Sequence, residues 1–331
     1  MLLRIFRGTG PEVIVMIFII TLLVWISTFL NPQILSSFYY DTNPMPLYGL
    51  LKTITWNNPF AGALFSFSMV LLIAFLLVNF NTSVIFIKER TFLPATIYVV
   101  LSGLFPRYQL LNPVLPAAIF MMLAVRRIMD AYRKQGVAYN FFDAGILIST
   151  GTLFYANLIW FGLLLTIGIA LLRTGNFKEI LISFLGLATP WFLTFGFFYV
   201  SGKDLSSLLS VVGSNLFSKS AEYHFLGMTI IVLIIIGIII LVSTVHLLLS
   251  MSTKKIKSRK TFYLLFWTFF ISAAMFLILP SVSVEIFWLT GIPVSYFMSH
   301  YFVFAKNKLI SEILFTELFI TIALVQIFYI I

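Results

Sequence analysis

Long apolar runs separated by short polar stretches make up the pattern of this chain. A run such as IVLIIIGIIILVSTVHLLL is apolar on every face, whereas the strands of an outer-membrane barrel alternate over about ten residues. The pattern therefore predicts an all-α, polytopic helical membrane protein with about eleven transmembrane helices. We expect these helices at 13–30, 61–79, 91–105, 109–125, 144–156, 158–172, 180–200, 225–251, 262–279, 286–304 and 311–331.

The stretch 143–172 reads either as one long helix or as two short ones meeting at 154–157. Cytoplasmic loops of membrane proteins are enriched in Lys and Arg, so the charge distribution separates the two readings. With two helices, 17 of the 21 basic residues lie on the cytoplasmic side, whereas with one helix the split is 10 to 11. The sequence thus predicts two short helices, a cytoplasmic amino terminus and an external carboxyl terminus, in a bacterial inner membrane.

The longest early polar interruption, 31–60, is predicted to be an external loop with an acid in it. Asp41 stands there in a tyrosine-rich context, and an amphipathic run follows two prolines. We expect a short helix near 45–55 that lies along the membrane surface. A second external loop, 201–224, has apolar residues at helical spacing and is expected to form a surface helix on the same side.

Composition narrows the class further. Hydrophobic residues make up 61% of the 331 residues and charged residues only 10%, which predicts a single membrane domain over 1–331, with parts 1–225 and 226–331. The net charge of +10 is explained by the cytoplasmic loops and predicts no nucleic-acid partner. Because there is no cysteine and the three histidines are scattered, we expect no metal and no other cofactor.

Polar residues at the external ends of the expected helices are the candidates for chemistry. An acid there deprotonates an acceptor, and an arginine holds a phosphate, which together are the minimal set for sugar transfer from a lipid phosphate. Asp41 is the candidate catalytic residue, although its carboxylate could equally cap the turn before Pro44. The candidate substrate-binding residues are Arg107, Tyr108, Asn112, Tyr155, Asn157 and Trp191.

Four motifs in 1–225 resemble the multi-spanning C class of glycosyltransferases, which use polyprenyl-phosphate sugars. They are YYDTNPMPLYGLL after the first span, FPRYQLLNPVLPAAIF between the third and fourth, the helix pair FDAGILISTGTLFYANLIWFGLLLTIGIALL, and ATPWFLTFGFFYVSG. The resemblance implies a glycosyltransferase-C-like fold. It also implies a transferase acting on a polyprenyl-phosphate sugar at the outer leaflet.

The chain departs from that class at two positions. Asn112 stands where the class usually carries a second acid, and Phe154 stands where a lysine often precedes the tyrosine. The whole chain also resembles an inner-membrane family of Bacteroidota, some members of which have been labelled carotene monooxygenases. Three scattered histidines cannot supply the four-histidine iron site of such enzymes.

Three functions are therefore carried forward. The first is sugar transfer from a lipid-phosphate donor at the outer leaflet, with membrane lipids as partners. The second is a non-catalytic scaffold or assembly subunit of an envelope machine, with a membrane-protein partner. The third is a lipid flippase or transporter, which the near absence of ionisable residues within the spans disfavours.

Overall fold

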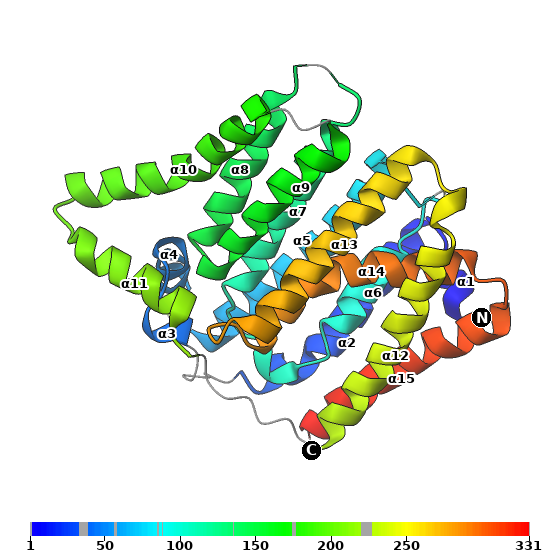
Figure 1. Cartoon of the computed structure of the whole chain (residues 1–331). Helices are drawn as coiled ribbons and strands as arrows, with labels where there is room; N and C mark the ends of the chain where they lie inside the picture. Colours follow the sequence, from blue (N-terminus) through cyan, green and yellow to red (C-terminus); the bar gives the residue numbers. More distant parts are fainter. Residues whose placement is uncertain are drawn as a thin grey trace.

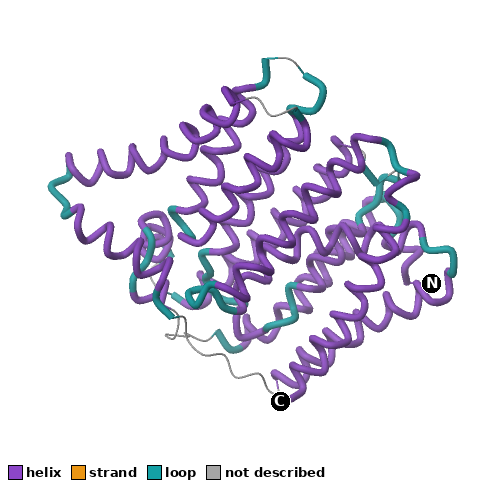
Figure 2. The backbone as a smooth tube through the Cα atoms, viewed as in Figure 1, coloured by secondary structure: helices purple, strands orange, loops and turns teal. Residues whose placement is uncertain are grey.

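The computed structural model describes residues 2–32, 39–55, 58–84, 86–87, 89–134, 136–173, 177–219 and 227–330. Every regular element among these residues is a helix (Figures 1 and 2). The α-helices are α1 (Leu2–Phe6), α2 (Pro11–Leu30), α3 (Tyr39–Thr42), α4 (Pro46–Ile54), α5 (Pro59–Val84), α6 (Leu93–Leu101), α7 (Val114–Asp130), α8 (Ala138–Thr152), α9 (Leu163–Leu172), α10 (Phe177–Val200), α11 (Leu205–Phe217), α12 (Gly227–Leu249), α13 (Ile256–Ile278), α14 (Phe287–Phe304) and α15 (Lys308–Ile330). Four short 3-10 helices are η1 (Pro106–Tyr108), η2 (Ala156–Gly162), η3 (Met251–Thr253) and η4 (Val284–Ile286).

Each of the eleven stretches expected to be helical contains a helix. Six of these helices are long and apolar enough to cross a membrane, namely α2, α5, α10, α12, α13 and α15. The other five do not combine that length and hydropathy: α6, for example, has nine residues and so extends only about 14 Å at 1.5 Å per residue. The structure therefore supports a multi-pass membrane protein, and a count of eleven crossings stays a prediction.

The break predicted within 143–172 is confirmed. Helix α8 ends at Thr152, and Tyr155 has an extended backbone (φ −131°, ψ 102°) before η2 begins. At the end of α8, backbone amides donate to carbonyls three residues back, as Leu153 N does to Thr150 O. Such 3-10 hydrogen bonds often satisfy the last carbonyls of a helix. The short helices η2 and α9 follow the break.

The two expected loop helices are also present. Pro46 begins α4, where its missing N–H would have had no helical partner. Gly202, with φ +64°, ends α10 in the left-handed region, and Asp204 then caps α11 by accepting from Ser206 N at 3.0 Å. Figure 1 shows α3, α4 and α11 grouped at one end of the bundle, beside the turn that precedes α14. We call this the Asp41 end.

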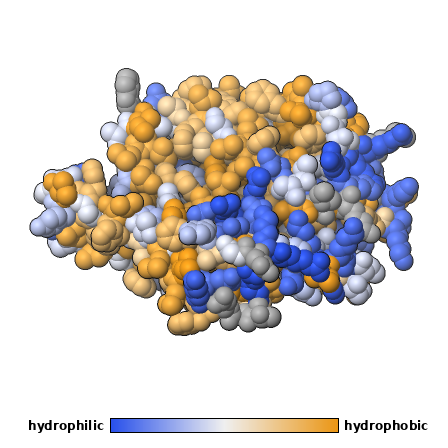
Figure 3. All heavy atoms as spheres, turned by 90° about the horizontal axis from the view of Figure 1, so that it is seen from above, coloured by the Kyte–Doolittle hydropathy of each residue, from blue (hydrophilic) through white to orange (hydrophobic). Residues whose placement is uncertain are grey.

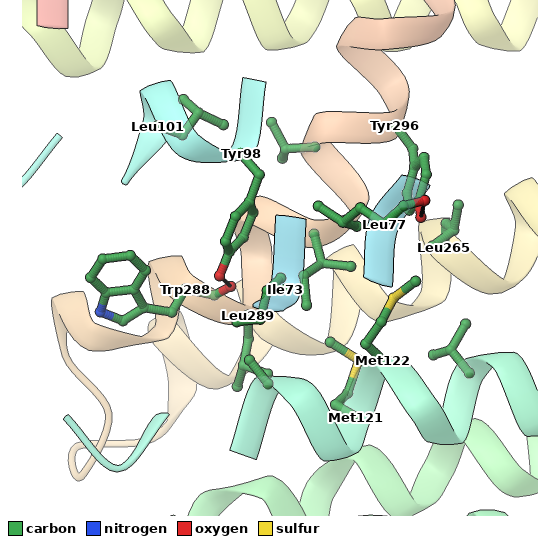
Figure 4. Close-up of a cluster of buried hydrophobic side chains, with 14 of the residues drawn as sticks. Ile73, Leu77, Tyr98, Leu101, Met121, Met122, Leu265, Trp288, Leu289 and Tyr296 are labelled. Atoms are coloured by element: carbon green, nitrogen blue, oxygen red, sulfur yellow. Dashed lines mark hydrogen bonds between the residues drawn. The ribbon is translucent and has the colours of Figure 1, made fainter. Parts of the chain in front are cut away.

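Helix α14 is the centre of the bundle, because its side chains from Trp288 to Val303 are almost all buried. It packs against α6, α7, α12, α13 and α15. Two tyrosines fasten it to its neighbours: Tyr98 OH of α6 donates to Trp288 O at 3.1 Å, and Tyr296 OH donates to Leu77 O of α5 at 2.7 Å (Figure 4). The core therefore assembles around the penultimate long helix and not around the 31–60 loop.

The opposite end of the bundle carries the end of α9, the start of α10 and the α12–α13 connection (Figure 1). Seen from that side, hydrophilic residues form a band across the face, and hydrophobic side chains flank it (Figure 3). We call this the Lys254 end, after the first lysine of the basic run 254–260. A polar face bordered by apolar flanks is what a membrane protein presents at the headgroup boundary.

Helices α8 and α10 make the closest helix pair, and two glycines permit it. A Cβ atom at Gly145 would lie 2.6 Å from Ser183 O, and one at Gly186 would lie 2.2 Å from Phe142 O. Small residues let two backbones approach within van der Waals contact, which is the main attraction between helices in a membrane.

We predict that Gly186→Ala destabilises the protein, because the new methyl group meets the backbone of α8 and the two helices must separate. Gly196→Ala on the same helix is the matched control, since a Cβ atom at that position would meet nothing within 4 Å. Removing a helix-interior glycine without a clash gains roughly 0.5–1 kcal/mol, so the control should hold or raise the unfolding temperature in detergent. Equal unfolding temperatures for Gly186→Ala and Gly196→Ala would contradict this close packing of α10 against α8.

Candidate functional site

Asp41 lies in α3 and is held by two side chains of α4. Tyr48 OH donates to Asp41 Oδ1 at 2.8 Å, and Lys52 Nζ lies 3.6 Å from the same oxygen. Lys52 Nζ also donates to the backbone oxygen of Asp41 at 2.9 Å. Tyr48 and Lys52 are four residues apart on α4 and so share one helix face. The short helix after the two prolines therefore presents a phenol and an ammonium to a single carboxylate.

The surroundings of Asp41 on α3 and α4 make its carboxyl a weaker acid than usual. Burial raises the pKa of the Asp41 carboxyl, and the Tyr48 hydrogen bond and the Lys52 charge oppose that shift. Burial together with the nearby Asp41 charge raises the pKa of Tyr48 well above its usual value, so its phenol keeps its proton and stays a donor. The Asp41 side chain is 19% exposed, which leaves one side of the carboxylate open.

A second carboxylate, Glu285, is buried in η4, just before the central helix. Its Oε1 accepts from Ser283 N at 3.0 Å and from Tyr155 OH at 3.3 Å, and Ser283 Oγ donates to its Oε2 at 2.7 Å. Burial raises the pKa of Glu285, and these hydrogen bonds partly offset the shift. Tyr155 comes from the break between α8 and η2, so the extended residue noted above supplies a donor to an acid 130 positions away.

Tyr40 lies within electrostatic range of both carboxylates. Its ring meets the Tyr48 ring edge-on, with centroids 6.1 Å apart. Burial raises the pKa of Tyr40 well above its usual value, and the charges of Glu285 and then of Asp41 add to the shift, which places this phenol in the field of both acids. We call Tyr40, Asp41, Tyr48, Lys52, Tyr155, Ser283 and Glu285 the Asp41–Glu285 cluster.

Amide and hydroxyl groups surround the cluster and fix the loops that carry it. Asn157 Nδ2 donates to Asn215 O of α11 at 3.2 Å, and Asn157 Oδ1 accepts from Ser281 Oγ at 3.3 Å. Asn215 Nδ2 in turn donates to Asn43 O at 2.8 Å. These bonds tie the α3–α4 loop, η2, α11 and the turn before α14 into one unit, so Asn157 serves as a positioning residue.

The other residues expected in the site lie elsewhere. Arg107 is exposed on η1, which packs against α2 and α15, and its charge acts on Tyr329 near the end of α15. Tyr108 is buried on the same element with its ring edge-on to Phe105, at 6.1 Å between centroids. Within the described ranges, no hydrogen bond or ion pair joins Arg107 to Asp41. Lys52 is the cation that the structure brings to this acid.

Asn112 and Trp191 have local partners. Asn112 Oδ1 accepts from Val114 N at 2.7 Å at the first residue of α7, which is the geometry of a helix cap. Trp191 lies half-buried on α10 beside Phe195, with ring centroids 6.0 Å apart. The position where the resembled class has its second acid thus holds a cap here, whereas Glu285 is a second acid whose charge, like that of Asp41, acts on Tyr40.

The alternative for Asp41, a side-chain cap of the turn before Pro44, can be compared with its contacts. In the part of the chain that the structure describes, the carboxylate is contacted by the side chains of Tyr48 and Lys52, and no backbone N–H donates to it. The contacts therefore favour a polar site over a turn cap.

A cavity of about 600 Å³ opens between α2, α5 and α6, and its lining includes Phe18, Phe75 and Asn79. It lies toward the carboxyl-terminal half of α5, whereas Ser66 near the start of that helix donates to Leu110 O, beside the Leu111 carbonyl that Tyr48 reaches. This cavity is therefore distant from the Asp41–Glu285 cluster. Among the described residues no group of three or more His, Asp or Glu side chains is placed to hold a metal ion.

Sequence reasoning did not assign Glu285 or Lys52 to the site. Glu285 is the only acid between 180 and 311 apart from Asp204 and Glu222, and it stands directly before an apolar helix. An acid at that position, followed by eighteen residues of helix, is a signal that could have marked it. Tyr155 is among the residues predicted to bind substrate, but its pairing with Glu285 could not be read from the sequence, because the contact spans 130 positions.

The stability of the cluster should depend on pH through Glu285. A carboxyl whose pKa is higher in the folded than in the unfolded chain contributes stability that is complete below the unfolded pKa and is lost as pH rises through the folded pKa. The unfolding temperature in detergent should therefore fall as pH rises from about 4 toward 8. Glu285→Gln, which keeps the acceptor for Ser283 N, should flatten this fall and melt higher at the upper end.

Asp41 contributes with the same sign, so part of the fall remains in that variant. Asp204→Asn is the control of opposite sign, because hydrogen bonds from Ser206 lower the pKa of Asp204 and its contribution disappears as pH falls. An unchanged pH slope in Glu285→Gln would show that this acid does not titrate in the range.

Comparison with known proteins adds a family and no function. No curated protein and no solved structure matches the chain. One family, described as a family of unknown function (DUF6427), matches residues 47–331.

Proposed function

This chain belongs to the DUF6427 family of unknown function, and we propose that it transfers a sugar from a lipid-phosphate donor at the outer face of the inner membrane. In this proposal Asp41 is the general base that takes the proton of the acceptor hydroxyl. The eleven helical segments all cross the membrane, with the amino terminus in the cytoplasm and the carboxyl terminus outside. The Asp41 end then faces outward, and the fold is glycosyltransferase-C-like.

The observation that carries the proposal is the state of Asp41. It is a partly exposed carboxylate whose pKa is raised by burial, positioned by Tyr48 and adjacent to an ammonium group. General bases work best when their pKa approaches the working pH, and partial burial is how proteins achieve this for carboxyls. Burial also raises the pKa of Glu285, which adds a second group that can hold a proton.

The phosphate of the donor is assigned to Lys52. Its side chain is 28% exposed and its Nζ stands 3.6 Å from Asp41 Oδ1, so a phosphate bound there would lie within reach of the base. Arg107 belongs to another part of the same end, near Tyr329. A lysine binds phosphate as a compact point charge, without the forked geometry of arginine. The pair Asp41 and Lys52 thus replaces the pair Asp41 and Arg107 expected from the sequence.

The proposal is tested by the lipid-linked sugars of a strain that lacks the gene. A missing transferase leaves its donor unused, so the strain should accumulate a polyprenyl-phosphate sugar that the wild-type gene removes. Asp41→Asn should fail to remove it although the variant reaches the membrane at the wild-type level. Lys203→Met, which alters a lysine seated near the rings of Phe197 and Phe198 in the α10–α11 turn, is the control and should complement fully.

The competing proposal is a scaffold for a membrane-protein partner. It is favoured by α10, of whose most apolar stretch only 17% is buried, which leaves a long apolar flank for lipid or for another protein. In that case Asp41, Tyr48 and Lys52 serve only to hold α3 against α4. Full complementation by Asp41→Asn, with no lipid-linked sugar accumulating in the deletion strain, would establish the scaffold over the transferase.

A further inference from the structure

Two histidines that are 54 positions apart meet between α12 and α14. The ring centroids of His246 and His300 lie 5.6 Å apart, and Tyr301 meets His246 edge-on at 5.3 Å. Ser243 lies one turn before His246 on the same helix and is fully buried. Lys254 reaches this place from the basic run after α12 and contacts Nε2 of His300. We call Ser243, His246, Lys254 and His300 the Ser243–His300 cluster.

The contact with Lys254 fixes which nitrogen of His300 carries the proton. A lysine ammonium can only donate, so Nε2 must accept and the neutral ring must carry its hydrogen on Nδ1. That Nδ1 is buried and no described residue accepts from it. Ring faces of Phe262 and Phe304, each with its centroid 5.3 Å from Lys254 Nζ, hold the ammonium in place. The contacts of Lys254 therefore fix His300 as a donor through its Nδ1–H.

Two more polar atoms share this environment. Ser243 Oγ and His246 Nδ1 are also buried without a partner among the residues described. A buried polar group without a partner is costly, so three of them are unfavourable for a purely structural arrangement. A bound group with several acceptor oxygens supplies partners for donors of this kind.

The charge decides the class of ligand. The Lys254 ammonium stands against His300, so the charge next to the cluster repels cations and attracts anions. We propose that the Ser243–His300 cluster binds a phosphate group, with Lys254 as the charged contact and Ser243, His246 and His300 as hydrogen-bonding contacts. This site lies at the Lys254 end and does not depend on transfer chemistry at Asp41.

The phosphate has two chemical sources. Leu248 and Leu249 at the end of α12 are 51% and 78% exposed, so the cluster lies beside an apolar surface where the headgroup of an anionic phospholipid would lie. A small soluble phosphate could reach the same donors from the polar face. Adding each source to the purified, delipidated full-length protein distinguishes between them.

The experiment compares inorganic phosphate, phosphatidylglycerol in mixed micelles, and a neutral galactolipid without phosphate. The readouts are the unfolding temperature and, for the lipids, retention in native mass spectrometry. Phosphatidylglycerol or inorganic phosphate should raise the unfolding temperature, and the one that acts identifies the source. Lys254→Met and His300→Gln should each weaken its binding about tenfold, the loss expected for one charge-assisted hydrogen bond.

Lys255→Met is the matched control, since it removes the same charge from the neighbouring position and should bind like the wild type. Ser243→Ala is a second variant that removes one donor with little change in volume, and it should weaken binding in the same direction. The proposal is overturned if the galactolipid acts as well as phosphatidylglycerol, if no additive stabilises the protein, or if Lys255→Met loses as much affinity as Lys254→Met.

Discussion

Purified Asp41→Asn protein is expected to turn over a polyprenyl-phosphate sugar about 10²- to 10⁴-fold more slowly than the wild type, the usual loss when a general base is removed. Asparagine keeps the size of the side chain and an oxygen that can accept from Tyr48. The fold of α3 and α4 should therefore persist, which an unfolding temperature no lower than that of the wild type would verify. Release of the lipid phosphate in micelles measures the rate.

Lys52→Met should affect the same reaction differently. Removing the ammonium weakens the hold on the donor phosphate, so KM should rise more than kcat falls. Lys203→Met at the same end of the molecule is the control and should leave both constants unchanged. A rate for Asp41→Asn equal to that of the wild type would exclude base catalysis at this residue.

Much of the local structure follows from the sequence. The break at 154–157 was predicted from charge alone, and the structure ends α8 at Thr152 and begins η2 at Ala156. The two loop helices follow from Pro46 and from the glycine and aspartate before α11, residues whose backbone preferences act within one or two turns. Local chemistry of this kind leaves a readable trace because it needs no distant partner.

The composition of the site could not be read in the same way. Tyr155 and Glu285 are 130 positions apart, and Lys52 was regarded as one of four external charges rather than as the partner of Asp41. The histidines appeared scattered because His246 and His300 lie on different helices, yet their rings are 5.6 Å apart. In each case the contact is set by how the helices pack, and helix packing in an apolar chain leaves little pattern in the sequence.

The central position of α14 shows why helix packing leaves so little pattern in the sequence. In a membrane protein both the lipid-facing and the buried side chains are apolar, so hydrophobicity does not distinguish a peripheral helix from a central one. Helix α12 is more apolar than α14, yet its outward side chains are exposed, whereas the side chains of α14 from Trp288 to Val303 are almost all buried. Only the packing of neighbouring helices, including Tyr98 and Tyr296, identifies the central one.

Phe297→Ala is therefore expected to be among the most damaging single changes, at about 3–5 kcal/mol of unfolding free energy. Phe297 is fully buried on α14, and its ring stacks on Phe266 with centroids 4.6 Å apart, so alanine leaves a cavity that lipid cannot fill. Phe270→Ala on α13 makes the same chemical change at a ring that is 59% exposed, and it should change stability by about 0.5 kcal/mol or less. Unfolding in mixed micelles measures both. Equal losses would mean that α14 lies at the lipid surface, and then the turn that carries Glu285 toward Asp41 would lose the rigid support on which the proposed site depends.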